Sequence, residues 1–327
     1  MIMLFLTMLA AAAPAPAATP AKIAARYGFA GEILIAKGNR IVVERVFGSV
    51  APGGKKRHRT GQRWRLASIT KQVTAVQVMQ VVERGRLTLD RSLEPEFGSS
   101  LKGITARMLL QHHSGLANAD DTPTEKGQLP SYYRALGADK RSRAASHAYC
   151  VSLKGTPDAA FAYNNCDYRL LGELIPALPL LGRYGGRTVP GFVGGKPEPR
   201  FNLLSFGAAG ALTGTARELF RFDRSLMTGK FLSSAARAEL WKPEGGRSYQ
   251  ALGQWVFPAT LKGCTAPKRV VQRDGEIGGV QTRNFIFPDD DLIVILFTNR
   301  SADDFAIGEV WQGKGFAYDL LSKAACP

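Results

Sequence analysis

The sequence predicts an α+β fold, in which one antiparallel sheet is flanked by helices and carries an inserted, mostly helical subdomain. β-Branched runs that are typical of paired strands lie near both ends of the chain, at residues 32–46 and 282–297. Helical segments interrupted by Pro- and Gly-rich loops occupy residues 86–205 between them. With 327 residues, 45% of them hydrophobic, the chain can build a large core or two subdomains that share one.

We expect three parts in the chain. Residues 1–18 are uncharged, apolar and then Ala/Pro-rich, which indicates a signal peptide and hence a periplasmic or secreted protein. This run is shorter than a typical membrane span of about 20 residues, so we expect no stable span. Since it has no positive charges, a misplaced start and a retained anchor stay open as alternatives. Residues 19–85 and 206–327 form the sheet subdomain, and residues 86–205 form the helical one.

The first elements predicted are a hairpin and a long helix. Residues 32–36 and 41–46 are strand-like and flank the turn Lys37-Gly38-Asn39-Arg40. From Ser68 to Arg84, apolar side chains cover more than one helical face, so this helix should be buried, and Gly85 is a candidate for its C-terminal cap.

Further helices are predicted at residues 105–113 and 167–175, and the longest loop at residues 183–200. Thr215 and Glu218 have the spacing of a capping box, which predicts a helix start. The chain should end with two strands, at residues 282–287 and 292–297, and a closing helix over residues 302–324.

Cysteine and histidine positions argue against a metal site. The four cysteines of an exported protein indicate two disulfides with three possible connectivities, of which we expect Cys150 with Cys166 and Cys264 with Cys326. No Cys-x-x-Cys or His-Glu-x-x-His pattern is present, so we expect no metal and no cofactor.

The net charge of +16 favours anionic surroundings, although it equally serves solubility. The basic run at residues 55–59 predicts a solvated loop or a contact with an anionic substrate. Because no aromatic residues are interleaved with it, we do not expect nucleic-acid binding. We expect a monomer that acts on a small-molecule or peptide substrate, for which fragments of the cell wall are one candidate.

Ser68 and Lys71 carry the strongest chemical signal. On a helix, positions i and i+3 share a face about 5–6 Å apart, so Lys71 can reach the Ser68 hydroxyl. A partly desolvated lysine can accept the proton of a serine nucleophile. The same spacing recurs at Ser99 and Lys102, but only Ser68 begins a buried helix.

Six segments, in this order along the chain, resemble the beta-lactamase-related serine hydrolases, which include class C beta-lactamases, D-alanyl-D-alanine carboxypeptidases and family VIII esterases. The resemblance extends over residues 30–325, and the segments are 66–71 (LASITK), 109–116 (LLQHHSGL), 163–172 (YNNCDYRLLG), 207–219 (GAAGALTGTAREL), 252–255 (LGQW) and 274–279 (DGEIGG).

This resemblance implies a beta-lactamase/transpeptidase-like fold with the active site between its two subdomains. It implies that Ser68 is the acylated nucleophile, Lys71 its proton acceptor, and Tyr163 the acid and base for the leaving group and deacylation. Asn165 is expected to contact the substrate, and the backbone amides of Ser68 and Glu276 to form the oxyanion hole.

One motif departs from the family pattern. The family has Lys or His, then any residue, then Gly, whereas this chain has Arg273-Asp274-Gly275. Arg273 can still grip a carboxylate, but arginine does not exchange protons at ordinary pH. We expect a hydrolase that cleaves an ester, a D-amino-acid peptide or a beta-lactam. A penicillin- or cell-wall-binding protein that acylates slowly or not at all is the alternative.

Overall fold

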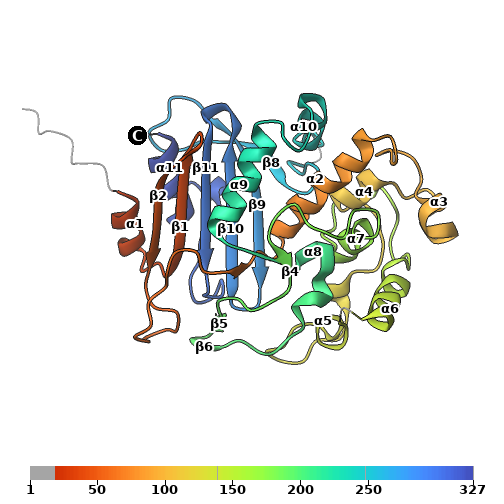
Figure 1. The fold of residues 1–327 in the computed structure, drawn as a ribbon, viewed down its shortest axis with the longest axis horizontal. Helices are drawn as coiled ribbons and strands as arrows, with labels where there is room; N and C mark the ends of the chain where they lie inside the picture. Colours follow the sequence, from red (N-terminus) through yellow and green to blue (C-terminus); the bar gives the residue numbers. More distant parts are fainter. Residues whose placement is uncertain (1–18, 138, 247, 327) are drawn as a thin grey trace, which may run out of the picture.

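A six-stranded antiparallel sheet forms the centre of the molecule (Figure 1). The computed structural model describes residues 19–137, 139–246 and 248–326, so the predicted signal peptide lies outside the described residues. The strand order is β2-β1-β11-β10-β9-β8, which confirms the expected antiparallel sheet. The strands are β1 (Gly31–Lys37), β2 (Arg40–Phe47), β8 (Trp255–Ala259), β9 (Lys268–Ile277), β10 (Val280–Phe287) and β11 (Leu292–Thr298).

Helices cover both faces of this sheet, and β11 is accordingly buried at every position. Val294 and Leu296 pack in one cluster, whereas Ile293 and Ile295 belong to the other. The first cluster includes α1 (Pro20–Arg26) and α11 (Phe316–Ala325), and the second includes α2 (Ile69–Glu83) and α9 (Ala216–Met227).

Most of the remaining helices lie on the far side of α2 from most of the sheet, whereas α10 lies above α2 in this view (Figure 1). Both expected disulfides are present: Cys150–Cys166 joins the end of α6 to the start of α7, and Cys264–Cys326 ties the C-terminus to the β8–β9 connection. The helices other than α1, α2, α9 and α11 are α3 (Glu94–Phe97), α4 (Ala106–Gln111), α5 (Ser131–Ala135), α6 (Lys140–Cys150), α7 (Asn165–Leu171), α8 (Gly207–Gly210) and α10 (Ser234–Leu240).

The predictions of the hairpin, the buried helix and the capping box are confirmed. In α2 even polar side chains are buried, and Thr74 donates a hydrogen bond to the carbonyl of Ala208 at 2.8 Å. At the start of α9 the Thr215 hydroxyl accepts from the Glu218 amide, and the Glu218 carboxylate accepts from the Thr215 amide.

Two predictions of local structure were wrong. The closing helix begins at Phe316 rather than at residue 302, because Gly308, Gly313 and Gly315 adopt positive φ values of 85°, 65° and 97°. The long loop contains three short strands, and the Arg-Asp-Gly motif lies inside β9. The short strands of the molecule are β3 (Trp64–Arg65), β4 (Arg183–Tyr184), β5 (Phe192–Val193), β6 (Lys196–Pro197) and β7 (Leu212–Gly214).

Candidate active site

Ser68 lies at the N-cap of α2, where the chain turns sharply out of β3. Ala67 just before it has φ = 47°, a left-handed conformation that costs energy for a residue with a side chain. Gly275 of β9 packs directly against this turn, since a Cβ there would collide with the Leu66 carbonyl and approach the Ser68 amide nitrogen. The tight packing therefore brings the β9 edge beside Ser68.

Ser68, Lys71 and Tyr163 meet at one point. The Ser68 Oγ lies 2.6 Å from the Tyr163 hydroxyl, and the Lys71 Nζ donates to the same Oγ at 3.2 Å. Lys71 also donates to the Asn165 Oδ1 at 2.6 Å and to the Ala209 carbonyl at 2.9 Å. A deprotonated Lys71 has two N–H groups, which can keep donating to Asn165 and Ala209, and its lone pair would then point to Ser68.

Lys71 is completely buried, and this environment favours its neutral form. Burial is the main cause that lowers the pKa of Lys71 to about 8, and the positive charge of Arg273 lowers it further, against the opposing effect of Tyr163. A lysine with this pKa is partly deprotonated near neutral pH, as a general base must be.

Arg273 contacts both Tyr163 and the backbone of Ser68. Its Nε donates to the Ser68 carbonyl and its NH2 donates to the Tyr163 hydroxyl, both at 2.9 Å. Burial alone would raise the pKa of Tyr163, but Lys71 and Arg273 together bring it below its usual value. Arg273, which stands where the resembling family has Lys or His, thus still stabilises the phenolate form of Tyr163. The Arg273 NH1 is buried without a hydrogen-bond partner among the described residues.

Asn165, an expected substrate contact, is held at both ends of its amide. The Oδ1 accepts from Lys71, and the Nδ2 donates to the Tyr133 hydroxyl at 2.8 Å and to the Asp120 carboxylate at 3.1 and 3.2 Å. Tyr133 in turn donates to Asp120 at 2.6 Å. Asp120 and Tyr133 were not predicted from the sequence, because no local pattern links them to α7.

The other residues of β9 that the sequence singled out line the same cavity as Ser68. Asp274 and Glu276 both line the cavity together with Gly275, and Asp274 forms an ion pair with Arg283 at 3.2 Å. Burial raises the pKa of Glu276 above its usual value. The negative charge of Asp274 is thus directed at Arg283 rather than left to oppose Arg273.

A buried His112–Asp167 pair lies beneath Tyr163, with the His112 ring centroid 4.7 Å from that of Tyr163. The Asn164 amide lies 3.2 Å from His112 Nδ1, and the Asp167 carboxyl lies 3.1 Å from the same nitrogen. Burial raises the pKa of Asp167 well above its usual value and lowers that of His112 well below. We therefore assign both side chains as neutral, and the Ser114 hydroxyl donates to Asp167 at 2.5 Å.

Ser68 lines a cavity of about 730 Å³. Its described lining includes four carboxylates and only two guanidinium groups, which contrasts with the net charge of +16 for the whole chain. The charged residues are Asp120, Asp274, Glu276, Asp303, Arg273 and Arg283, and the aromatic ones are Tyr133, Tyr163, Phe201, Phe206 and Trp255. In the described part of the chain, no group of three His, Cys, Asp or Glu side chains could hold a metal ion, and no helix is long and apolar enough to cross a membrane.

Comparisons with known proteins agree with this architecture. Residues 20–179 match the Beta-lactamase family model. A penicillin-binding protein of Bacillus subtilis strain 168 is 21% identical over 85% of this chain and 70% of its own length. Other curated relatives match over shorter stretches, and the chain spans between 28% and 37% of their length.

Two solved structures superpose over nearly the whole chain. A penicillin-binding protein from Bacillus halodurans, 20% identical, gives a TM-score of 0.67 over 93% of this chain and 98% of that one. The D-amino acid amidase from Ochrobactrum anthropi SV3, 16% identical, gives 0.69 over 92% and 93%. The fold is therefore beta-lactamase/transpeptidase-like. With the family match, residues 20–179 form a domain of the Beta-lactamase family, and the chain as a whole is similar to the beta-lactamase-related serine hydrolases.

Proposed function

We propose that this protein is a serine hydrolase that cleaves a small amide or ester through an acyl-enzyme on Ser68. The observation that carries the proposal is the contact of the Ser68 hydroxyl with both Lys71 and Tyr163 at the mouth of a cavity. The cavity's lining residues between positions 120 and 201 come from the expected helical subdomain, and Ser68 and those between positions 206 and 303 come from the expected sheet subdomain. This supports, as a further part of the proposal, an active site between the two expected subdomains.

In the proposed mechanism, neutral Lys71 accepts the Ser68 proton as the Oγ attacks the carbonyl carbon. The backbone amides of Ser68 and Glu276 stabilise the resulting oxyanion. Tyr163, held by Arg273 and Lys71, gives its phenolic proton to the leaving nitrogen or oxygen as the C–N or C–O bond breaks, which leaves the acyl-enzyme and a Tyr163 phenolate. Water then attacks the acyl carbon while this phenolate accepts a water proton, and the acid product leaves as the bond to Ser68 Oγ breaks and the Oγ regains its hydrogen from Lys71.

Among the three substrate classes expected from the sequence, the charge of the cavity favours D-amino-acid amides and esters with a free ammonium group. Asp120 is exposed and accepts three hydrogen bonds, one fewer than the roughly four that a carboxylate can accept. A substrate ammonium can complete this set, whereas the carboxylate of a penicillin would meet an excess of negative charge. The structural likeness to a D-amino acid amidase agrees with this choice.

The two disulfides also support a location outside the cytoplasm, in the periplasm or the medium. We propose this location together with cleavage of the predicted signal peptide.

Turnover of a panel of substrates tests the proposed function. We expect hydrolysis of D-aminoacyl amides and aryl esters by the wild type, and a loss of at least about 10³-fold in Ser68→Ala, because the nucleophile is removed. Ser99→Ala is the matched control, since this exposed serine begins the second Ser-x-x-Lys sequence. Equal turnover by Ser68→Ala would refute the proposal, and a folded wild type that binds but never turns over would favour the binding-protein alternative.

A further inference from the structure

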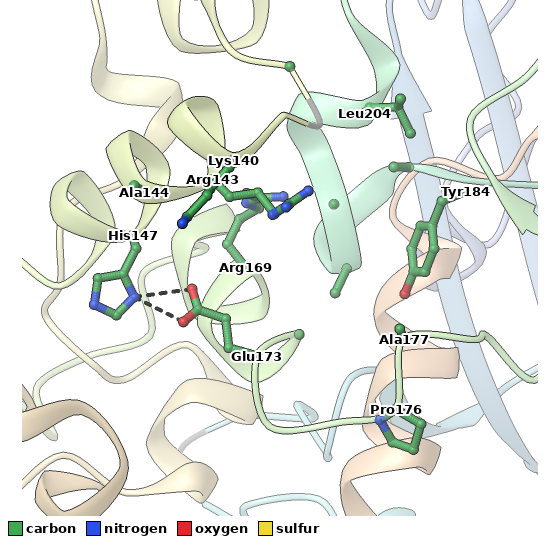
Figure 2. Close-up of a pocket in the computed structure, with 15 residues that line it drawn as sticks. Lys140, Arg143, Ala144, His147, Arg169, Glu173, Pro176, Ala177, Tyr184 and Leu204 are labelled. Atoms are coloured by element: carbon green, nitrogen blue, oxygen red, sulfur yellow. Dashed lines mark hydrogen bonds and ion pairs between the residues drawn. The ribbon is translucent and has the colours of Figure 1, made fainter.

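A second cavity, of about 580 Å³, lies between α6, the end of α7 and α8 (Figure 2). Its described lining shares no residue with the cavity at Ser68. We name it the α6–α7 cavity and define it by Lys140, Arg143, Arg169, Tyr184 and Leu204. Its volume falls within the range of about 300–1,000 Å³ that small-molecule sites occupy.

One end of the α6–α7 cavity is cationic. Figure 2 shows the side chains of Lys140, Arg143 and Arg169 close together above Glu173. Glu173 is the one carboxylate in the described lining, and it accepts a hydrogen bond from the His147 Nδ1 at 2.9 Å. Three cationic side chains and one carboxylate in the lining give this end of the cavity an excess of positive charge.

Arg169 is fixed in place before any ligand binds. Its Nε and NH2 donate to the Ser146 hydroxyl at 3.0 and 2.8 Å, and Ser146 is buried. Its NH1 lies against the backbone of Gly207, where a Cβ would overlap with it. A guanidinium held in this way loses little conformational entropy when it binds a carboxylate or a phosphate.

The opposite wall of the cavity is apolar. Pro176, Ala177 and Leu204 lie there with the ring of Tyr184. Burial raises the pKa of Tyr184 to about 12, so its phenol stays neutral and adds no negative charge. The cavity therefore combines a fixed cationic end with an uncharged wall.

We propose that the α6–α7 cavity is a second binding site, for a small organic anion with a carboxylate or phosphate head on an apolar body. Arg169 binds the head with its guanidinium, and Lys140 and Arg143 add positive charge. The apolar body packs on Tyr184 and Leu204. This site does not depend on hydrolysis at Ser68, so it stands or falls separately from the proposed function.

Calorimetric titration of the full chain with four probes tests this site. In buffer free of phosphate and low in salt, we expect phenyl phosphate or benzoate to bind at least about tenfold more tightly than both neutral benzamide and inorganic phosphate. Whichever of the two anions binds more tightly identifies the head group. If benzamide binds as tightly as the anions, the cationic end does not contribute to binding and the proposal fails. If inorganic phosphate binds as tightly as phenyl phosphate, the apolar wall does not contribute and the proposal fails.

Three variants locate the binding. Arg169→Gln should weaken the tighter anion at least about tenfold, and Lys140→Gln severalfold, while Arg141→Gln should change it less than about twofold. Arg141 is the matched control, because it is exposed on the same helix and its loss removes the same charge. Lys140→Gln serves if Arg169→Gln fails to fold, since Lys140 is exposed. Unchanged affinity in folded Lys140→Gln and Arg169→Gln would place the anion elsewhere and overturn the proposal.

Discussion

At the scale of single residues, the burial of Lys71 is the feature from which the proposed chemistry follows. Its pKa of about 8 lies below that of an ordinary lysine, so the neutral base becomes more abundant as the pH rises. For a neutral ester that does not itself titrate, kcat/KM should rise about tenfold per pH unit below pH 8 and level off above it. A profile that is flat between pH 6 and 9 would show that Lys71 is not the base.

Arg273 offers a second prediction at this scale. Arg273→Ala removes the donors to Tyr163 and to the Ser68 carbonyl, so kcat/KM should fall about 10²-fold and the pKa of Tyr163 should rise. Arg273→Lys, which keeps a cation, should retain activity within about tenfold of the wild type. Steady-state kinetics and ultraviolet titration of the tyrosinate measure both effects. Wild-type activity in folded Arg273→Ala would show that Tyr163 does not need this cation.

Sequence predicted the local part of the candidate site better than its long-range part. Ser68 and Lys71 lie one helical turn apart, so helix geometry alone brings them together. Asp120 and Tyr133 reach Asn165 only through tertiary packing, and no spacing in the sequence encodes that contact. Asn165 was expected to face the substrate, yet its amide is engaged with protein groups at both ends.

At the scale of elements, strands and capped helices were predictable because their signals are local. The capping box at Thr215 needs only two side chains three residues apart, and the hairpin of β1 and β2 needs only alternating runs and a turn. The start of the closing helix was predicted wrongly, because the apolar residues after position 302 suggested a helix. The glycines at 308, 313 and 315 adopt positive φ values there, and the chain turns instead. The strands β5 and β6 were not predicted either, because two residues are too few to show the alternation of apolar and polar side chains that indicates a strand.

The disulfide at the start of α7 should matter for activity as well as for stability. Cys150 and Cys166 are 16 residues apart, which corresponds to about 3 kcal/mol in the chain-entropy model. The Cys150→Ser/Cys166→Ser variant should lose about that free energy of unfolding in urea, and also activity, because Cys166 adjoins Asn165.

The other disulfide is the matched control. Cys264 and Cys326 are 62 residues apart, so the same model gives about 4 kcal/mol for Cys264→Ser/Cys326→Ser. This variant should be destabilised yet keep its kcat/KM where it is folded, because neither cysteine lines the cavity. If the Cys150→Ser/Cys166→Ser variant is fully active when folded, the disulfide does not help to position Asn165.

At the scale of the whole molecule, charge is distributed unevenly. The chain is strongly basic, whereas the cavity at Ser68 has more carboxylates than cations. We expect the p-nitroanilide of a D-amino acid to be hydrolysed at least about tenfold faster, in kcat/KM, than its N-succinyl derivative, because an ammonium is replaced by a carboxylate.

Asp120→Asn should reduce this preference severalfold. The ratio of the two kcat/KM values is the proper readout, because any disturbance of Asn165 affects both substrates alike. A preference that is reversed in the wild type, or that persists unchanged in Asp120→Asn, would show that Asp120 does not select the substrate.

The central claim is that Ser68 becomes acylated, and intact-protein mass spectrometry tests it most directly. After brief incubation with an activated aryl ester, a D-aminoacyl amide or a penicillin, followed by acid quenching, we expect a mass increase equal to one acyl group. Peptide mapping should place the group on Ser68, and Ser68→Ala should show none while Ser99→Ala behaves as the wild type. An adduct on another residue, or turnover that persists in Ser68→Ala, would contradict the account.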